Sequence, residues 1–96
     1  MTVEWDPGKD QQNRRKHGVS FQEAQEVFLS GRDYLEVFDS VHSKEEDRFL
    51  AIGATAHGVT VVVWTEREPD AIRIISARPA TRREQDLYRS YMEKHP

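Results

Sequence analysis

Three strand-like segments in the second half of the chain constrain its fold most strongly. They cover residues 48–56, 59–66 and 71–77. Two-residue turn signals at His57-Gly58 and Pro69-Asp70 separate them and favour an antiparallel meander. The middle segment carries consecutive valines from Val61 to Val63, which predicts a central strand that is covered on both faces.

Helices are predicted before this meander. Asp6-Pro7 suits a helix start, because Asp can cap the helix and Pro needs no N–H at the first position. That helix would end at His17-Gly18; its apolar face is almost absent, so it must lie on the surface, pinned at its ends by Trp5 and Val19. A capping box of Ser20 and Glu23 opens a second, amphipathic helix.

The remaining segments complete an α+β architecture. A second capping box, Thr81 with Glu84, opens a last helix that runs to about Lys94. Residues 2–5 suit an edge strand, and residues 34–38 could form a further short strand. We therefore expect a single domain over residues 1–96, in which two N-terminal helices pack on an antiparallel sheet of three to four strands and a C-terminal helix follows.

Composition excludes several classes of protein. The chain has 14 Lys+Arg against 17 Asp+Glu, and this net charge of -3 argues against an obligate, non-specific polyanion binder. It has no cysteine, so neither a disulfide framework nor thiolate chemistry is available. No signal-peptide or membrane-span pattern is present, which predicts a soluble cytoplasmic protein. We find no metal-binding or cofactor motif and expect neither a metal nor a cofactor.

Arginines gather at the corner between the last strand and the last helix. Period two would place Arg78 on the same face as Ile72 and Ile74, at the rim of the sheet. Arg78 could simply form a salt bridge, to Glu84 or to an acid on the second helix, or it could bind phosphate together with the N–H groups of the last helix's N-terminus. Arg82 and Arg83 oppose the dipole of that helix, which makes an anionic ligand more plausible.

Arg67 ends the preceding strand of the meander. Because the chain reverses between the strands, and a seven-residue strand spans about 23 Å, Arg67 and Arg78 are expected at opposite ends of the pair. This spacing argues against a simple cluster of the two guanidinium groups.

The first predicted helix carries a second basic group. Lys9, Asn13 and Lys16 share one helical stripe, and His17 lies four residues after Asn13. The stripe could be a solvated face, in which Lys16 and His17 interact favourably with the negative end of the helix dipole. Alternatively, it could face RNA, with His17 exchanging a proton. The other histidines carry weaker signals: His57 is assigned to a turn, His42 to a polar loop and His95 to the tail.

The same residues carry a family resemblance. The segments WDPGKDQQNRRKHGVSFQEA, RFLAIG, VVVWTER and IRIISARPATRREQDLY, taken in order, resemble the BrnT toxins over almost the whole chain. The resemblance implies a RelE-like fold and a ribonuclease toxin of a type II toxin–antitoxin pair. It also implies a BrnA-like antitoxin partner, which would bind operator DNA in place of this chain, and a possible toxin–antitoxin hetero-oligomer.

The resemblance also marks candidate site residues. Its motif positions are Lys9, Asn13, Lys16, His17, Arg48, Arg67, Arg78, Glu84 and Tyr88. We predict that Arg67 and Arg78 stabilise the phosphate and that His17 or Lys9 handles protons during metal-independent RNA cleavage. We predict substrate binding by a wider set: Asn13, Lys16, Arg48, Arg82, Arg83, Glu84 and Tyr88. A non-catalytic toxin of the same fold that binds a protein target, and a plain nucleic-acid-binding module, are the alternatives.

Overall fold

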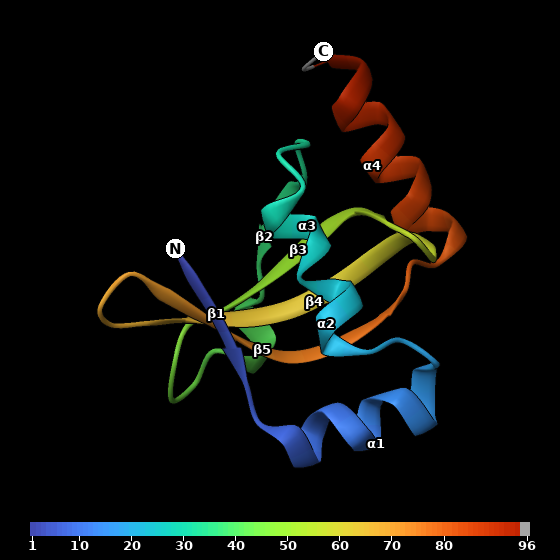
Figure 1. The fold of residues 1–96 in the computed structure, drawn as a ribbon. Coiled ribbons are helices and arrows are strands. Elements are labelled where there is room, and N and C mark those ends of the chain that lie inside the picture. The colour runs from blue at the N-terminus through green and yellow to red at the C-terminus, as the bar shows by residue number, and fades with distance from the viewer. Residues whose placement is uncertain (95–96) are drawn as a thin grey trace.

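The computed structural model describes residues 1–94, and within them five strands form one sheet in the order β1-β5-β4-β3-β2 (Figure 1). The strands are β1 (Thr2–Trp5), β2 (Leu35–Phe38), β3 (Arg48–Thr55), β4 (Gly58–Arg67) and β5 (Ala71–Pro79). The meander β3-β4-β5 is antiparallel, as predicted. Strand β4 is central, and Val61 and Val62 on its two faces are fully buried.

The sheet differs from the prediction in size and in direction. It has five strands and is mixed, whereas we expected three to four antiparallel strands. Strand β1 runs parallel to β5, with Thr2 opposite Ala71 and Trp5 opposite Ile74, and β2 closes the other edge antiparallel to β3. A four-residue strand has too little periodicity to reveal its partner, so only the tertiary structure shows this pairing.

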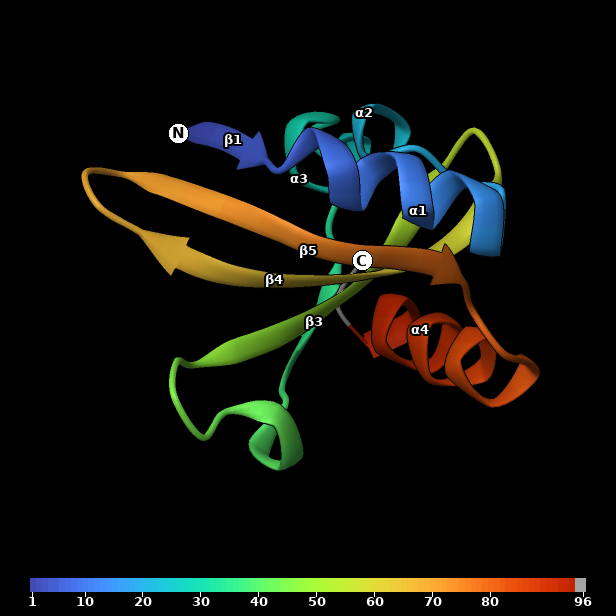
Figure 2. The same cartoon turned by 90° about the horizontal axis from the view of Figure 1, so that it is seen from below.

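Helices cover both faces of the sheet. They are α1 (Pro7–His17), α2 (Phe21–Ala24), α3 (Glu26–Leu29) and α4 (Arg82–Lys94), and a short 3₁₀ helix, η1 (Ser40–His42), joins β2 to β3. Figure 2 shows α1, α2 and α3 on one face and α4 with η1 on the other. The predicted second helix is present as the pair α2 and α3, separated at Gln25.

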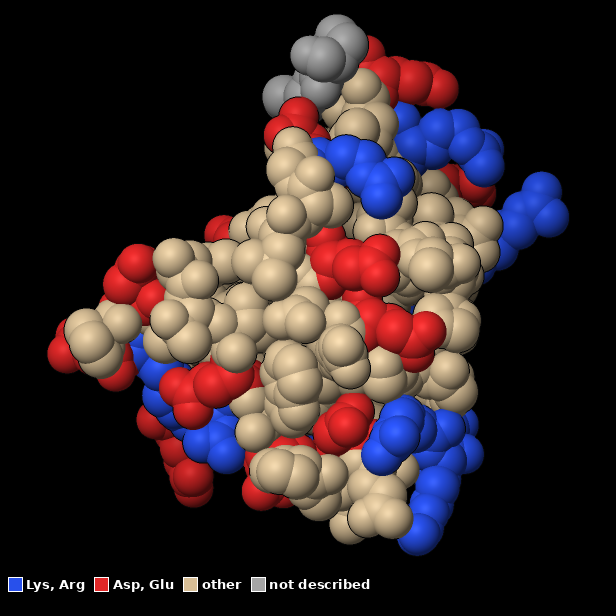
Figure 3. All heavy atoms as spheres, in the orientation of Figure 1, with Lys and Arg blue, Asp and Glu red and all other residues tan. Residues whose placement is uncertain are grey.

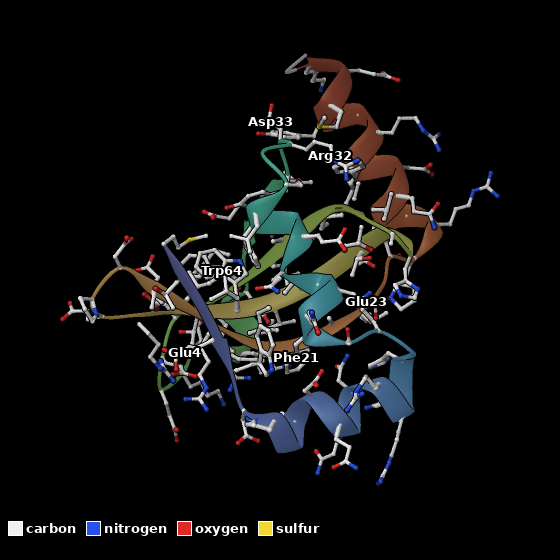
Figure 4. The ribbon with its side chains drawn as sticks, in the orientation of Figure 1. Glu4, Phe21, Glu23, Arg32, Asp33 and Trp64 are labelled. Atoms are coloured by element: carbon white, nitrogen blue, oxygen red, sulfur yellow. The ribbon has the colours of Figure 1, made fainter. Side chains whose placement is uncertain are left out.

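The main core lies between the sheet and α2–α3. Phe21, which is fully buried, and Trp64 both belong to it (Figure 4). Trp64 stacks on Phe49 with ring centroids 4.7 Å apart. Gly53 on β3 allows the close approach of α3, because a Cβ there would lie 2.9 Å from Cγ1 of Val27. The predicted apolar face of residues 21–28 therefore packs on the sheet, and burying side chains of this size stabilises the fold by about 1.5–3 kcal/mol each.

The predicted helix caps are present. The Asp6 carboxylate accepts the N–H of Lys9, and both hydrogen bonds of the Ser20–Glu23 capping box form. Helix α1 ends at Gly18, whose φ of 72° favours glycine. The β3–β4 turn differs by one residue from the prediction: Ala56 and His57 make the turn, and Gly58 begins β4 opposite Thr55.

A bulge in β5 changes which residues share a face. Trp64 pairs with Ile74 and Val63 with Ser76, so Ile75 has no counterpart on β4. The extra residue moves Ser76 to the face opposite Ile74, whereas strict alternation predicted that they share a face. Ala77 is instead buried in the main core with Ile74, and Arg78 lies on the α4 side.

Helix α1 is attached to β5 by one polar side chain. Asn13 is buried, and its amide donates to the carbonyls of Val19 at 2.9 Å and Ala77 at 2.7 Å. The side-chain oxygen of Asn13 accepts the N–H of Ala77 at 3.1 Å. Strand β1 pairs only with residues 71–74 of β5. Asn13 therefore supplies hydrogen-bond partners for the N–H and the carbonyl of Ala77, which lie beyond the end of β1. Trp5 and Val19 also pack in the core, as expected for the ends of α1.

Charged side chains are segregated by element on the face that carries α1–α3. Figure 3 shows acidic side chains over α2 and α3, and basic ones on α1 and along α4. Within residues 1–94, no helix is both long enough and apolar enough to cross a membrane.

Asn13→Ala should lower the free energy of unfolding by about 2–4 kcal/mol. The substitution removes three hydrogen bonds and leaves two carbonyls and one N–H near the core without their partner. Urea unfolding measures the change, and Gln12→Ala on the exposed side of the same helix is the matched control. A difference below about 0.5 kcal/mol between the two variants would contradict this role for Asn13.

Candidate active site

The basic stripe of α1 borders a hollow beside β5. Lys9, Lys16 and His17 line it together with Ile75 and Ser76, and its volume is about 260 Å³. Lys9 and Lys16 are exposed, and neither forms an ion pair with any residue in the described part of the chain. Asn13 lies in the wall of the hollow, but its amide is engaged by the main chain. The structure thus gives Asn13 a structural role, while the two lysines are available to a ligand.

Four arginines lie on the opposite face of the sheet, the α4 side. Cross-strand partners point to the same face, so the registers place the side chains of Arg48 and Arg73 on either side of Thr65. Arg67 follows two residues further along β4, and Arg78 lies opposite Val61. We refer to Arg48, Arg67, Arg73 and Arg78 as the arginine face.

Arg67 and Arg78 lie at opposite ends of the β4–β5 pair, as the strand lengths predicted. Arg78 is opposite Val61, and Arg67 is six residues further along β4, which is about 20 Å. Arg67 instead donates to Glu46 at 3.1 Å, and Glu46 also lies 3.8 Å from Arg48. One carboxylate therefore connects Arg67 to Arg48 but not to Arg78.

Arg78 is held by a two-pronged ion pair. Its two terminal nitrogens donate to the two carboxylate oxygens of Glu84 at 2.7 and 2.9 Å. The Arg78 guanidinium, followed by the N–H of Thr81, holds the pKa of Glu84 at about 2, and the pairing raises the pKa of Arg78. The salt bridge considered from the sequence is therefore present. It fixes the guanidinium plane and leaves other N–H donors of Arg78 available.

Arg48 is less completely paired than Arg78. Its Nε is buried and has no hydrogen-bond partner among residues 1–94, and its ion pair with Glu46 is long, at 3.8 Å. Arg48 and Arg78 line one hollow of about 420 Å³ together with Ile75 and Ser76. The buried Nε is closed to a ligand, but the long ion pair leaves the terminal nitrogens of Arg48 free to bind an anion in the hollow.

The two hollows meet at the β5 bulge. Ile75 and Ser76 line both of them, so the hollow beside α1 and the hollow on the arginine face are neighbours at the edge of β5. We call the two hollows together the β5 groove. It brings Lys9, Lys16 and His17 from one side toward Arg48 and Arg78 from the other, an arrangement suited to a polyanion.

Other predicted residues lie outside the groove lining. Arg82 and Arg83 are exposed in the first turn of α4 and form no ion pair with the described residues. Tyr88 packs against the small cluster of Ile52, Val61 and Ala80. Within residues 1–94, no group of three or more His, Cys, Asp or Glu side chains is placed to hold a metal ion.

Comparison with known proteins assigns the family. The family model described as "Ribonuclease toxin, BrnT, of type II toxin-antitoxin system" matches residues 5–84. The chain belongs to the BrnT family. Among solved structures it is similar to the Brucella abortus ribonuclease toxin BrnT, at 30% identity and a TM-score of 0.63, over 85% of this chain and 99% of that one. No curated protein sequence matches the chain.

The BrnT match covers both sides of the β5 groove. Lys9, His17, Arg48, Arg78 and the Arg78 partner Glu84 all fall within the matched residues, whereas Tyr88 lies beyond them. The family assignment from the sequence is confirmed, and it indicates a ribonuclease toxin of a toxin–antitoxin system with an antitoxin partner.

Sequence reasoning missed two residues in this BrnT chain. Arg73 belongs to the arginine face and lies 3.9 Å from Glu4; its alternation with Ile72 and Ile74 was a usable signal. His42, which we assigned to a polar loop, lines the same hollow as Arg48 and Arg78. Its spacing of three residues from Asp39 was the only local signal, and that spacing is common in loops.

The Arg78–Glu84 pair should make stability depend on pH in the acid range. The pKa of Glu84 is about 2 in the folded protein against an ordinary 4.5, so the unfolded chain takes up the proton first as pH falls. Stability from the pair is thus fully present above about pH 4.5 and is lost between there and pH 2. The side chain of Arg78 is 34% exposed, so solvent screening limits the effect to about 2 kcal/mol at most.

Unfolding of the wild type and of Glu84→Gln from pH 6 to pH 2 measures this contribution. The wild type should be more stable at pH 6, and the difference should narrow toward pH 2. A difference that stays constant over this range would show that the charge of Glu84 does not stabilise the fold.

Proposed function

We propose that this chain is a metal-independent endoribonuclease that cuts RNA lying in the β5 groove. The observation that carries the proposal is that Ile75 and Ser76 line both hollows of the groove, with free lysines on one side and Arg48 and Arg78 on the other. An RNA backbone crossing the edge of β5 would meet cations on both sides of one phosphate. Membership in the BrnT family supports RNA as the polyanion.

The proposed reaction uses the ribose of the substrate as the nucleophile. The 2′-oxygen attacks the adjacent phosphorus after losing its proton, and the 5′-oxygen leaves after gaining one. Arg48 and Arg78 would stabilise the negative charge that builds up on the phosphate oxygens, and Lys9 or His17 would transfer protons. Glu84 would orient Arg78, since both of its carboxylate oxygens accept from that guanidinium.

The other predicted residues have supporting roles in this proposal. Arg67 lies far from Arg78, so its role would be indirect: it would hold Glu46, which in turn orients Arg48. Lys16, Arg82 and Arg83 would contact flanking phosphates of a longer RNA. Tyr88 would hold α4 on the sheet by packing on the cluster of Ile52, Val61 and Ala80. We further propose a RelE-like fold and action in the cytoplasm.

Purified protein should cleave RNA in the presence of EDTA. The products should carry a 2′,3′-cyclic phosphate and a 5′-hydroxyl, because the attacking oxygen comes from the ribose. Mass spectrometry of a cleaved oligonucleotide identifies both ends. Cleavage that requires added divalent metal and leaves 5′-phosphates would refute the mechanism. Growth arrest by a folded protein that cuts no RNA would favour a toxin that binds a protein target.

Arg78→Ala and Arg48→Ala should each lower kcat by about 10²–10³-fold. Each removes a preorganised donor to the charged transition state. Arg89→Ala is the matched control, since Arg89 is exposed on α4 and its ion pair with Asp86 lies outside the groove lining. Single-turnover cleavage by the folded variants measures the effect. Wild-type rates in Arg78→Ala would remove Arg78 from the site.

A BrnA-like antitoxin should inhibit by covering the β5 groove, and any operator DNA should be bound through that antitoxin. A partner that buries Lys9, His17 and Arg78 with acidic or apolar residues would exclude RNA, and opposite charge would speed the encounter. Amide hydrogen exchange of the toxin–antitoxin complex should show protection in α1 and in residues 75–84. Protection confined to the acidic residues 36–47, with RNA still cleaved by the complex, would contradict this account.

A further inference from the structure

A histidine that the proposed mechanism leaves unused lies over the arginine face. His42 ends η1 in the connection between β2 and β3, on the same side of the sheet as α4 (Figure 2). It lines the 420 Å³ hollow with Arg48 and Arg78, and it also lines a neighbouring open hollow with Lys44, Glu45 and Glu46. An imidazole is thus placed in the same hollow as both arginines.

The ring of His42 is paired with a carboxylate. Its Nδ1 lies 2.9 Å from Oδ2 of Asp39, and the side chain of Asp39 is 15% exposed whereas that of His42 is 66% exposed. The carboxylate accepts, so Nδ1 carries the proton and donates. In the neutral ring Nε2 is then the free acceptor, and among residues 1–94 it has no hydrogen-bond partner. A residue that lines the hollow therefore carries a free proton-accepting nitrogen.

The loop that carries this pair is closed by its own hydrogen bonds. The N–H of Asp39 donates to the carbonyl of Arg48 at 2.9 Å. The hydroxyl of Ser43 donates to the carbonyl of Asp39 at 2.5 Å and accepts the N–H of Arg48 at 2.9 Å. The same closed loop therefore fixes His42 relative to Arg48, and a fixed geometry of base and cation is what proton transfer at a phosphate requires.

A second histidine of the chain provides a comparison. His57 also contacts a carboxylate, that of Glu23, but Glu23 is already part of the α2 capping box. His57 lines neither part of the β5 groove, and no arginine of the arginine face forms an ion pair with Glu23. Two histidines with the same type of partner thus differ in their surroundings: His42 lies in the groove and His57 lies outside it.

We infer that His42 is the general base of the proposed RNA cleavage and that Asp39 positions it. The proton of the 2′-hydroxyl moves to Nε2 while the bond from the 2′-oxygen to phosphorus forms and the bond from phosphorus to the 5′-oxygen breaks. The leaving 5′-oxygen takes its proton from the α1 side of the groove, from Lys9 or His17. The imidazolium that results is stabilised by Asp39. This assignment rests on the proposed function and narrows the role of His17 to that of an acid.

His42→Ala should reduce kcat by about 10²–10⁴-fold with little change in KM, the range typical of a lost general base. Added imidazole should restore part of the activity, which it could not do if His42 only stabilised the fold. Asp39→Asn should lower kcat by a smaller factor, and His57→Gln is the matched control that should cleave at the wild-type rate. Wild-type activity in His42→Ala, or a loss that imidazole does not restore, would overturn the inference while leaving the proposed function in place.

A modified substrate distinguishes the base from the acid. Replacing the 5′-oxygen at a mapped cleavage site by sulfur creates a leaving group that needs no protonation. The loss of cleavage rate in His42→Ala should persist on this RNA. The loss of rate caused by removing the acid, Lys9 or His17, should disappear. Recovery of His42→Ala on the sulfur substrate would overturn the assignment as base. If the wild type cleaves neither the ordinary RNA nor the RNA with the 5′-sulfur, the proposed function and this inference both fail.

Discussion

The attachment of α1 to the open edge of β5 through Asn13 is the interaction on which the rest of the site depends. Strand β1 covers β5 only as far as Ile74, and beyond it the N–H and the carbonyl of Ala77 would lack partners. One side-chain amide satisfies both and also binds the carbonyl of Val19. Because α1 has almost no apolar face, hydrophobic burial along its length cannot replace this contact. The helix can therefore keep an exposed basic stripe and still be held beside the sheet.

The β5 bulge decides which charges meet. If β5 alternated regularly from Ile74 to Arg78, with no bulge at Ile75, Arg78 would share a face with Ile74 and the main core, where an unpaired guanidinium is not tolerated. With the bulge, Arg78 joins Arg48, Arg67 and Arg73 on the α4 side. Three glutamates, Glu4, Glu46 and Glu84, pair with these four arginines. Arg48 and Arg67 share Glu46, so Arg48 is less completely paired than Arg78 at the hollow.

Local sequence signals predicted local structure well. The caps at Asp6, Ser20 and Thr81 form, because each depends on residues within three positions of one another. The central position of β4 followed from its consecutive valines, and the separation of Arg67 from Arg78 followed from strand length. The family resemblance identified the basic residues on both sides of the groove.

Features that depend on distant residues were not predictable in the same way. The parallel pairing of β1 with β5 joins residues about seventy positions apart, and the bulge at Ile75 leaves no mark in an apolar strand. Asn13 was predicted to bind substrate because a polar residue within a basic stripe gives no sign that its amide is used by β5. The pairing of His42 with Asp39 needed the closed loop of residues 39–48, which forms only when β2 and β3 pair.

The central claim is that one RNA strand occupies both sides of the β5 groove. The most direct measurement is an NMR titration of the protein, labelled with ¹⁵N and ¹³C, with an oligonucleotide that carries 2′-deoxyribose at the scissile position and cannot be cut. The account predicts that signals of Lys9 and His17 on α1 shift together with those of Arg48 and Arg78 on the arginine face, with one common dissociation constant. Shifts confined to a single side of β5, or different constants for the two sides, would contradict it.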